Sequence, residues 1–416
     1  MTPENPAPNS GHADGPLAGL KILDMSRILA GPSATQILGD LGADVVKVER
    51  PGVGDDTRKW GPPFLKDGTG AETSESSYYL SANRNKRSIA VDFTKPEGQR
   101  LVRSLAAKAD VLVENYKAGT LARYGLDYGS LRAVTPGLIY CSITGFGLTG
   151  PYAHRAGYDY LIQAMGGIMS LTGETEGEPM KVGVAVADLM AGVYATVGIL
   201  AALHHRDRTG QGQHIDLSLF DTQIAWLSNA GQYYLTSGEP TPRHGNGHPT
   251  IVPYQTFRAA DDWLILAVGN DGQFARFCEF AGRPDLAADP RFATNTERVR
   301  HREVLVPIVA GLIAERPRAH WLDGLEPLGV PCGPINRIDQ VFADPQALAR
   351  AMKVSMPHPL APEPIDLIGS PLKLSETPVS YRRHPPLNGE HTEEVLGEWL
   401  GYGAGEIAAL KDAGVC

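Results

Sequence analysis

Asp188 stands directly before a run of apolar residues, 189–203, whose composition favours a helix. An aspartate at the start of a helix commonly serves as its N-cap, where its charge also suits the helix dipole. A carboxylate in the same place can act as a covalent nucleophile if one of its oxygens stays free. Position alone favours the cap, so the case for chemistry depends on the surrounding motif.

Composition limits the kinds of protein that this sequence can be. Its 416 residues are 42% hydrophobic, which is enough for a large core and suggests two domains. The formal net charge of −9 argues against a nucleic-acid-binding protein, which would depend on basic contacts to phosphate. That charge does not exclude an anionic small ligand, because local basic residues decide whether one binds.

The cysteines and histidines give no sign of a disulfide or a metal site. The four cysteines form no C-x-x-C pair, a pattern typical of reduced thiols in the cytoplasm. His244 and His248 are four residues apart, but their Gly-Asn-Gly loop has no nearby carboxylate or cysteine. We therefore expect a cytoplasmic protein without a bound metal.

The two segments that could address a membrane do not look like membrane segments. Residues 1–16 are polar and rich in Pro, Asn and Gly, so we expect a disordered tail and not a signal peptide. The apolar run 189–203 is short for a membrane span and is interrupted by small residues. The sequence therefore predicts a soluble protein with no membrane partner.

The first half of the chain alternates strands and helices, which predicts a parallel sheet with right-handed crossovers and a doubly wound α/β domain. Helices are expected at 30–42 and at 96–109, the second opened by Pro96. The strands are expected at 19–26, 44–50, 86–93, 110–116 and 138–146.

The second half of the chain does not continue this alternation of strands and helices. Residues 253–269 have the pattern of a hairpin around the polar turn 260–262, and helices are expected at 272–281 and 302–315. We therefore predict a large α/β domain over 17–222, a smaller α+β domain over 223–330, and a C-terminal segment over 331–416.

A dinucleotide-binding enzyme is the first alternative that such a domain suggests. Its glycine fingerprint should lie in the first strand-to-helix turn, where backbone approaches a pyrophosphate. That turn reads SRILAGPSA and contains Gly31 alone, and neither G-x-G-x-x-G nor a Walker loop follows a strand elsewhere. The sequence therefore disfavours a nicotinamide enzyme.

Motifs spread in order from about residue 17 to 416 resemble the class III CoA-transferases, the family of formyl-CoA transferase, carnitine CoA-transferase and α-methylacyl-CoA racemase. The motifs are LAGLKILDMSRILAGPSATQILGDLGADVVKVERPGVGDDTR, NRNKRSIAVDF, ADVLVENYKAGTLARYGL, ITGFGLTGPY, RAGYDYLIQAMGG, VADLMAGVYATVGILAAL, TGQGQHIDLSLFD, GVPCGPI and LNGEHTEEVL.

The resemblance implies a Rossmann-like large domain, a small domain, and a C-terminal segment that returns to the large domain. It also implies two chains interlocked as an intertwined homodimer. The expected substrates are acyl-CoA and small carboxylic acids, with coenzyme A as a substrate and no permanently bound cofactor.

The resemblance assigns roles to individual residues. The aspartate of VGVAVADLMAG, Asp188, is implied to be the nucleophile that carries the acyl group and then CoA as covalent intermediates. The residues implied to contact CoA are Ile28, Leu29, Ala30, Arg50, Asn115, Tyr116 and Arg123. The alternative for Arg50 and Arg123 is a solvated surface charge, and the resemblance favours contact with the ligand. Formyl-CoA transferase has Gln at the place of Leu29 and Lys at that of Thr144, so the acid used should differ.

Tyr158 bears on the racemase alternative. The racemase motif A-G-H-D supplies a histidine for acid–base work, and this chain reads Ala156-Gly157-Tyr158-Asp159. Tyrosine, with an ordinary pKa of ~10, is a poor base at neutral pH. A racemase is therefore the weaker family alternative. A CoA-binding scaffold without catalysis would need Asp188 to be a cap only.

Several segments resemble the succinyl-CoA:glutarate CoA-transferase branch of the family more closely, namely TIVPYQTF, RVRHREVLV and GPINRI, together with Arg243 and His248. A dicarboxylate acceptor leaves one carboxylate unreacted, and that group needs a cation or hydrogen-bond donors. The candidates are Arg243, His248 and Arg155, each of which could instead be structural.

Overall fold

The computed structural model describes residues 15–416, so all but the last two residues of the predicted tail 1–16 lie outside the described residues. The chain falls into two compact units. The first contains the chain up to Gly167 together with Val182–Asn229 and Gln346–Cys416, and the second contains Ile168–Lys181 and Ala230–Pro345. The domain boundaries predicted after 222 and 330 stay predictions.

The first unit is built on a six-stranded sheet in which every neighbouring pair is parallel. This sheet confirms the α/β class, and its order is β5-β2-β1-β6-β7-β8. Its strands are β1 (Lys21–Asp24), β2 (Asp44–Glu49), β5 (Lys86–Ala90), β6 (Val111–Glu114), β7 (Ile139–Thr144) and β8 (His214–Ser218). The last of these was not predicted.

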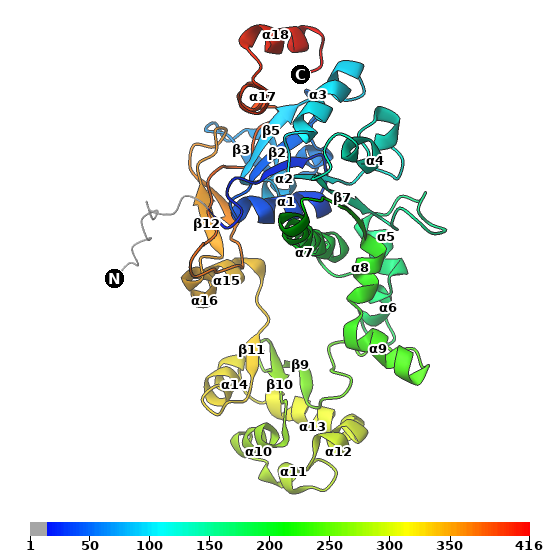
Figure 1. Cartoon of the computed structure of the whole chain (residues 1–416). Helices are drawn as coiled ribbons and strands as arrows, with labels where there is room; N and C mark the ends of the chain where they lie inside the picture. The colour runs from blue at the N-terminus through cyan, green and yellow to red at the C-terminus, as the bar shows by residue number, and fades with distance from the viewer. Residues whose placement is uncertain (1–14) are drawn as a thin grey trace. The chain divides into compact units, whose positions relative to one another are not determined.

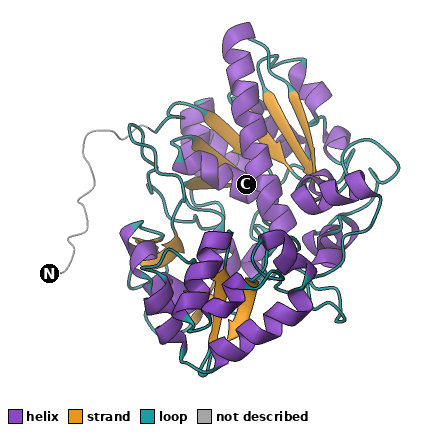
Figure 2. Ribbon diagram, turned by 90° about the horizontal axis from the view of Figure 1, so that it is seen from below, coloured by secondary structure: helices purple, strands orange, loops and turns teal. Residues whose placement is uncertain are grey.

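Helices cover both faces of this sheet (Figure 1 and Figure 2). On one face, α1 (Ala30–Asp40) and α7 (Val186–Thr209) pack on the odd-numbered residues of β6 and β7. On the other, α3 (Pro96–Ala106) and α17 (Thr392–Leu400) pack on the even-numbered residues of the same strands. Because alternate residues face opposite sides of a sheet, strands covered on both faces have runs of consecutive apolar residues, as in 111–113 and 139–141.

The remaining elements of the first unit are short and lie around the sheet. They are η1 (Asp56–Lys59), β3 (Phe64–Lys66), β4 (Glu72–Ser76), α2 (Ser77–Ser81), η2 (Leu121–Tyr124), α4 (Tyr128–Arg132), α5 (Asp159–Met165), α8 (Leu219–Ala225), β12 (Lys353–Met356), β13 (Ile365–Ile368) and α18 (Ala404–Asp412). At the boundaries between the units lie α9 (Ser228–Ser237) and α16 (Pro345–Ala349).

Helix α7 needs a separate account, because it is longer than the apolar run 189–203. By length and composition it could cross a membrane, the one helix among residues 15–416 that could. The short length of the run 189–203 was an argument against a membrane span, and the observed length of α7 removes that argument. The argument comes instead from burial, since Ala191, Ala195 and Ile199 are fully buried in the core beside α1. Gly192 permits this approach, because a Cβ there would lie 2.9 Å from the carbonyl oxygen of Ala30.

The second unit has a three-stranded antiparallel sheet in the order β11-β10-β9. Strands β9 (Tyr254–Arg258) and β10 (Trp263–Ala267) form the hairpin predicted over 253–269, and β11 (Cys332–Pro334) pairs with β10. The helices of this unit are α6 (Ile168–Leu171), α10 (Asp271–Phe280), α11 (Pro284–Ala288), α12 (Asn295–Arg300), α13 (Arg302–Ala314), α14 (Arg318–Leu325) and α15 (Ile338–Ala343). Two of them, α10 and α13, match the helices predicted at 272–281 and 302–315.

The order of the six-stranded sheet indicates where a ligand can bind. The chain runs outward through β2 and β5 on one side of β1 and through β6, β7 and β8 on the other. In open α/β sheets the loops diverge at such a point and leave a crevice at the carboxyl ends of the strands. The loops after β1 and β6 should therefore form the site.

Candidate active site

A pocket of about 140 Å³ lies at the carboxyl ends of β1, β6 and β7. We call it the Asp188 pocket. It brings together most of the residues that the resemblance assigned to the site. The predicted residues in its lining are Ile28, Leu29, Ala30, Asn115, Tyr116, Arg155 and Asp188, and Thr144 and Tyr158 line it too.

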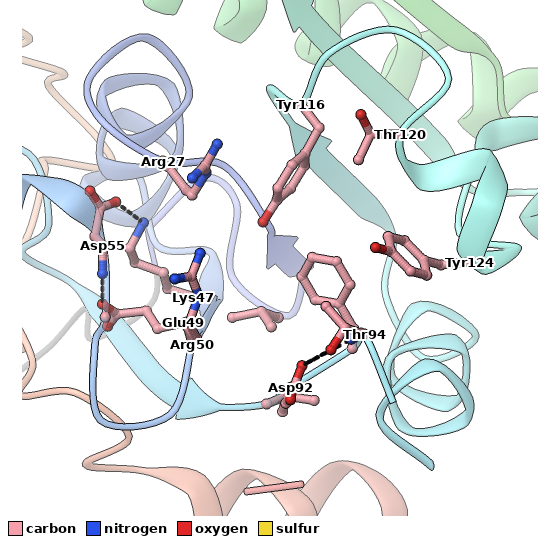
Figure 3. A pocket seen from close by; sticks show the side chains of 14 residues that line it. Arg27, Lys47, Glu49, Arg50, Asp55, Asp92, Thr94, Tyr116, Thr120 and Tyr124 are labelled. Atoms are coloured by element: carbon pink, nitrogen blue, oxygen red, sulfur yellow. Dashed lines mark hydrogen bonds and ion pairs between the residues drawn. The ribbon is translucent and has the colours of Figure 1, made fainter. Parts of the chain in front are cut away.

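A second pocket of about 180 Å³, the Arg50 pocket, adjoins the first, because Arg27 and Tyr116 line both (Figure 3). The Arg27 guanidinium lies 4.9 Å from the centre of the Tyr116 ring. Arg50 is exposed in the lining, and among residues 15–416 its guanidinium has no hydrogen bond or ion pair. The aromatic side chains of Phe93 and Tyr124 complete an aromatic wall, with ring centres 5.6 Å apart. The two adjoining pockets together offer aromatic rings and several cations, namely Arg27, Lys47, Arg50, Lys117 and Arg155.

Asp188 lies in the first turn of α7 but does not cap it. The N-cap is Ala185, which has no polar side chain. Asp159 Oδ1, at the start of α5, accepts hydrogen bonds from the backbone N–H groups of Ala187 at 2.8 Å and of Asp188 at 3.4 Å. No group among residues 15–416 donates a hydrogen bond to the Asp188 carboxylate. Its two oxygens therefore stay free, as a nucleophile requires.

The surroundings of Asp188 make its carboxylate easy to protonate. Burial, with a further contribution from the negative charge of Asp159, raises the pKa of Asp188 to about 7. The N-terminus of α7 would favour the ionised form, but that effect is smaller. At neutral pH the side chain is thus divided between a carboxylic acid and a poorly solvated carboxylate. Such a carboxylate is more basic than one in water, and this favours nucleophilic attack.

This raised pKa predicts that Asp188 destabilises the fold at alkaline pH. An aspartate ionises near pH 4 in the unfolded chain and near pH 7 here. The free energy of unfolding therefore falls as the pH rises from about 4 to about 7, and it stays lower above that range. Asp188→Asn should therefore melt about 3–6 °C above the wild type at pH 8, with a smaller difference at pH 5. Thermal melting at the two pH values measures this. Asp207→Asn, an exposed site on the same helix, should show no such pH-dependent gain.

Close backbone contact shapes the wall of the Asp188 pocket opposite α1. Gly145, just after β7, and Gly157, just before Tyr158, both line the pocket. A Cβ on either glycine would lie 2.5 Å from the Cα of the other, so neither position has room for a side chain. This contact holds the segment with Tyr158 and Asp159 against the end of the sheet, where Asp159 reaches α7.

The CoA contact expected for Asn115 stays a prediction, and the structure shows that its side chain also holds the loop after β1. Its Oδ1 accepts a hydrogen bond from the backbone N–H of Arg27 at 2.8 Å, and its Nδ2 donates to the Arg27 carbonyl at 2.6 Å. The side-chain amide is thus largely used in holding the loop after β1. Asn115 lines the Asp188 pocket, but it shapes the binding loop first.

The remaining predicted residues divide between the two units. Arg155 is in the Asp188 pocket, where its guanidinium lies 4.8 Å from the Tyr152 ring centre and 5.1 Å from that of Phe146. Arg123 is exposed on η2 and lines neither pocket.

Arg243 and His248 belong to the second unit. There the Arg243 guanidinium donates to the carbonyls of Glu174, Thr175 and Gly177. His248 Nδ1 accepts a hydrogen bond from the Thr250 N–H at 3.2 Å.

Three residues of the site were not predicted. Arg27 lines both pockets, pairs with Asp56 at 2.9 Å, and has a buried Nε without a partner among residues 15–416. Tyr78 in α2 packs edge-on to Trp60, and burial, together with the charge of Asp188, raises its pKa to about 12. Asp159 was part of a quoted motif. An aspartate at the start of a helix is a recognisable N-terminal signal in the sequence. Asp159 begins α5, but its side chain accepts hydrogen bonds from the first turn of α7.

Comparison with known proteins decides the family. A model of CoA-transferase family III matches residues 17–392, most of the chain. The chain belongs to this family. It is 50% identical to the succinate–glutarate CoA-transferase of Agrobacterium fabrum over 92% of this chain and 95% of that protein. It is 45% identical to the succinyl-CoA:glutarate CoA-transferase of Homo sapiens over 96% of this chain and 90% of that protein.

A solved structure agrees with this assignment. A CAIB/BAIF family protein from Brucella suis is 48% identical, with a TM-score of 0.84 over 93% of this chain and 100% of that one. Family III membership and transferase relatives at this level confirm that the chain is an enzyme that transfers CoA, as its motifs predicted. A scaffold without catalysis and a racemase both lose support.

Proposed function

We propose that this family III enzyme moves CoA from succinyl-CoA to a dicarboxylic acid such as glutarate, with Asp188 as the covalent nucleophile. The observation that carries the proposal is a carboxylate with two free oxygens in a pocket that also holds a cation, Arg155. The two curated relatives described above, whose names give succinate and glutarate, support the choice of acids.

The reaction would proceed through Asp188 in four balanced steps. The carboxylate attacks the succinyl thioester, which forms a mixed anhydride and releases CoA thiolate. The thiolate attacks the aspartyl carbonyl of the anhydride, which forms an aspartyl-CoA thioester and releases succinate. The acceptor carboxylate then displaces the thiolate to give a second anhydride. The thiolate finally attacks the acyl carbonyl of the acceptor and regenerates the free carboxylate of Asp188.

The adjoining pockets suit the two ends of an acyl-CoA. The nucleotide end carries phosphates and an adenine, and the Arg50 pocket offers Arg27, Arg50 and aromatic rings for them. The acyl end and the thioester would enter the Asp188 pocket past Leu29 and Ala30. Arg123, on the exposed side of η2, has less support as a CoA contact.

Arg155 is better supported than Arg243 as the partner of the second carboxylate. The negative charge of that group would oppose the ionised Asp188 unless a cation lies between them. Arg155 lines the same pocket as Asp188, and among residues 15–416 its guanidinium has no carboxylate partner. The Arg243 guanidinium already donates to three carbonyl oxygens.

Substrate profiling tests this proposal. With succinyl-CoA as donor, glutarate should exceed formate, oxalate and carnitine in kcat/KM by at least ~10-fold, or ~1.4 kcal/mol. Arg155→Gln should remove most of that preference, because it takes away the cation and keeps a polar side chain. Arg243→Gln is the matched control and should retain the preference. Equal use of all four acids by the wild type would contradict the choice of a C4–C6 dicarboxylate such as glutarate.

A homodimer, expected from the resemblance, stays part of the proposal. The side of α7 that faces away from the core presents a row of apolar residues, which a second copy of this chain would cover. These residues are Leu189, Val193, Tyr194, Val197 and Leu200, each at least 37% exposed.

A further inference from the structure

The loop between β1 and α1 is held almost entirely by side chains from elsewhere. Asp24 Oδ1 accepts from the Ser26 N–H at 2.9 Å, and Lys47 Nζ donates to the Ser26 carbonyl at 2.9 Å. Asn115 binds both the N–H and the carbonyl of Arg27. The Ile28 N–H points between the two oxygens of Asp55, 3.2 Å from each. Five consecutive backbone groups are thus satisfied by four side chains, an unusual share for a loop.

The loop needs this support because Ile28 has a strained backbone. Its φ of 71° is in the left-handed region, which a β-branched residue rarely adopts. The cost of this conformation is about 1–2 kcal/mol, so it persists only where the surroundings impose it. Ile28 and the two residues after it line the Asp188 pocket. The strained position therefore lies within the part of the loop that lines the site.

Lys47 and Asp55 form the centre of this support. Their Nζ and Oδ2 atoms are 2.9 Å apart, and both side chains are 0% exposed (Figure 3). Although burial opposes ionisation, Lys47 and the Thr57 N–H hold the pKa of Asp55 at about 2, so the pair stays charged across the physiological range. The Thr57 hydroxyl donates to Asp55 Oδ1 at 2.8 Å and fixes the carboxylate. Both residues line the Arg50 pocket, but their side chains have no solvent-exposed surface, so we expect the pair to act on a ligand mainly through the loop that it holds.

We propose that Lys47 and Asp55 are positioning residues for acyl-CoA. One member of the pair fixes the carbonyl at the start of the Ser26–Ile28 loop and the other fixes the N–H at its end. Together they hold the backbone in the shape that receives the CoA moiety before it arrives. Such preorganisation increases affinity, because the ligand does not have to order the loop. The inference depends on the proposed binding of acyl-CoA in the Asp188 pocket.

A double variant tests this role without leaving a buried charge unpaired. Lys47→Met with Asp55→Asn keeps the side-chain volumes and removes both charges, an exchange that is often neutral for stability. We expect it to fold, to raise the Kd for CoA at least tenfold in titration calorimetry, and to raise the KM for succinyl-CoA likewise. The KM for the acceptor acid should stay within about twofold.

The matched control is the buried pair of Asp40 and Arg84, with N–O distance 2.6 Å, in the same unit but outside both pockets. Asp40→Asn with Arg84→Met should leave the Kd for CoA unchanged. Thr57→Val, which removes one hydrogen bond to Asp55 and keeps both charges, should raise that Kd about threefold even if the double variant does not fold.

Three results separate the possible failures. If the double variant folds, a Kd for CoA within twofold of the wild type would overturn the positioning role. If the double variant does not fold, an unchanged Kd for CoA in Thr57→Val would overturn it instead. If the wild type neither binds CoA nor transfers it, the proposed function itself is wrong.

Discussion

Asp188→Asn and Asp188→Ala should each lower the rate of CoA transfer by at least ~10³-fold, which corresponds to ~4 kcal/mol of transition-state stabilisation. An amide or a methyl group cannot form the anhydride, and no carboxylate other than Asp188 is in the lining of its pocket. Steady-state transfer from succinyl-CoA to glutarate measures the loss. Both variants should still bind CoA, because the Asp188 carboxylate makes no hydrogen bond among residues 15–416 and the backbone bond to Asp159 is kept.

The covalent intermediate provides a second and independent measurement. Wild-type enzyme incubated with acyl-CoA and then treated with borohydride should carry a change in mass on the peptide that contains Asp188. Neither variant should show that change. Turnover near the wild-type rate in Asp188→Ala would end the covalent proposal, and an adduct on another residue would move the nucleophile elsewhere.

Strands covered on both faces were easy to predict, because each has a short run of consecutive apolar residues, VLV in β6 and IYC in β7. Residues 110–116 and 138–146 contain β6 and β7, and each observed strand is a few residues shorter than expected. Strand β8, HIDLS, was missed because it lies at the edge of the sheet and three of its residues are only partly buried. The contribution of segment 168–181 to the second unit was equally invisible, because it depends on contacts with residues far away in the chain.

The family motifs predicted which individual residues belong to the site, but not what each side chain contacts. The resemblance named Asp188 and the residues Ile28, Leu29 and Ala30 for the site, and the structure brings them together in one pocket, while their roles stay predictions. It could not say how each side chain is used, and Asn115 turned out to hold the loop. Asp159 and Tyr78 were passed over because each meets Asp188 across the fold. Asp159 accepts a hydrogen bond from the Asp188 N–H, and the charge of Asp188 contributes to the raised pKa of Tyr78. Such contacts join residues far apart in the chain, so no regular spacing in the sequence predicts them.

Arg27→Met should raise the KM for succinyl-CoA about 30-fold, or ~2 kcal/mol, with kcat within about threefold of the wild type. The guanidinium lies between the two pockets, stacked on Tyr116, and its buried Nε has no partner among residues 15–416. An anionic group at that point would receive a charge-assisted hydrogen bond. The ion pair with Asp56 is about one-third exposed on the Arg27 side, so its loss should cost little stability.

A truncated donor shows which part of the substrate Arg27 binds. Succinyl-pantetheine has the reacting thioester but lacks the nucleotide and its phosphates, so Arg27→Met and the wild type should have the same kcat/KM with it. Arg100→Met is the control for a lost arginine, since Arg100 is 62% exposed on α3, away from both pockets, and should leave the KM for succinyl-CoA unchanged. Binding energy that appears only with the full donor belongs to its phosphate groups. An equal loss with both donors would instead place Arg27 at the acyl end and leave Arg50 as the cation for the nucleotide.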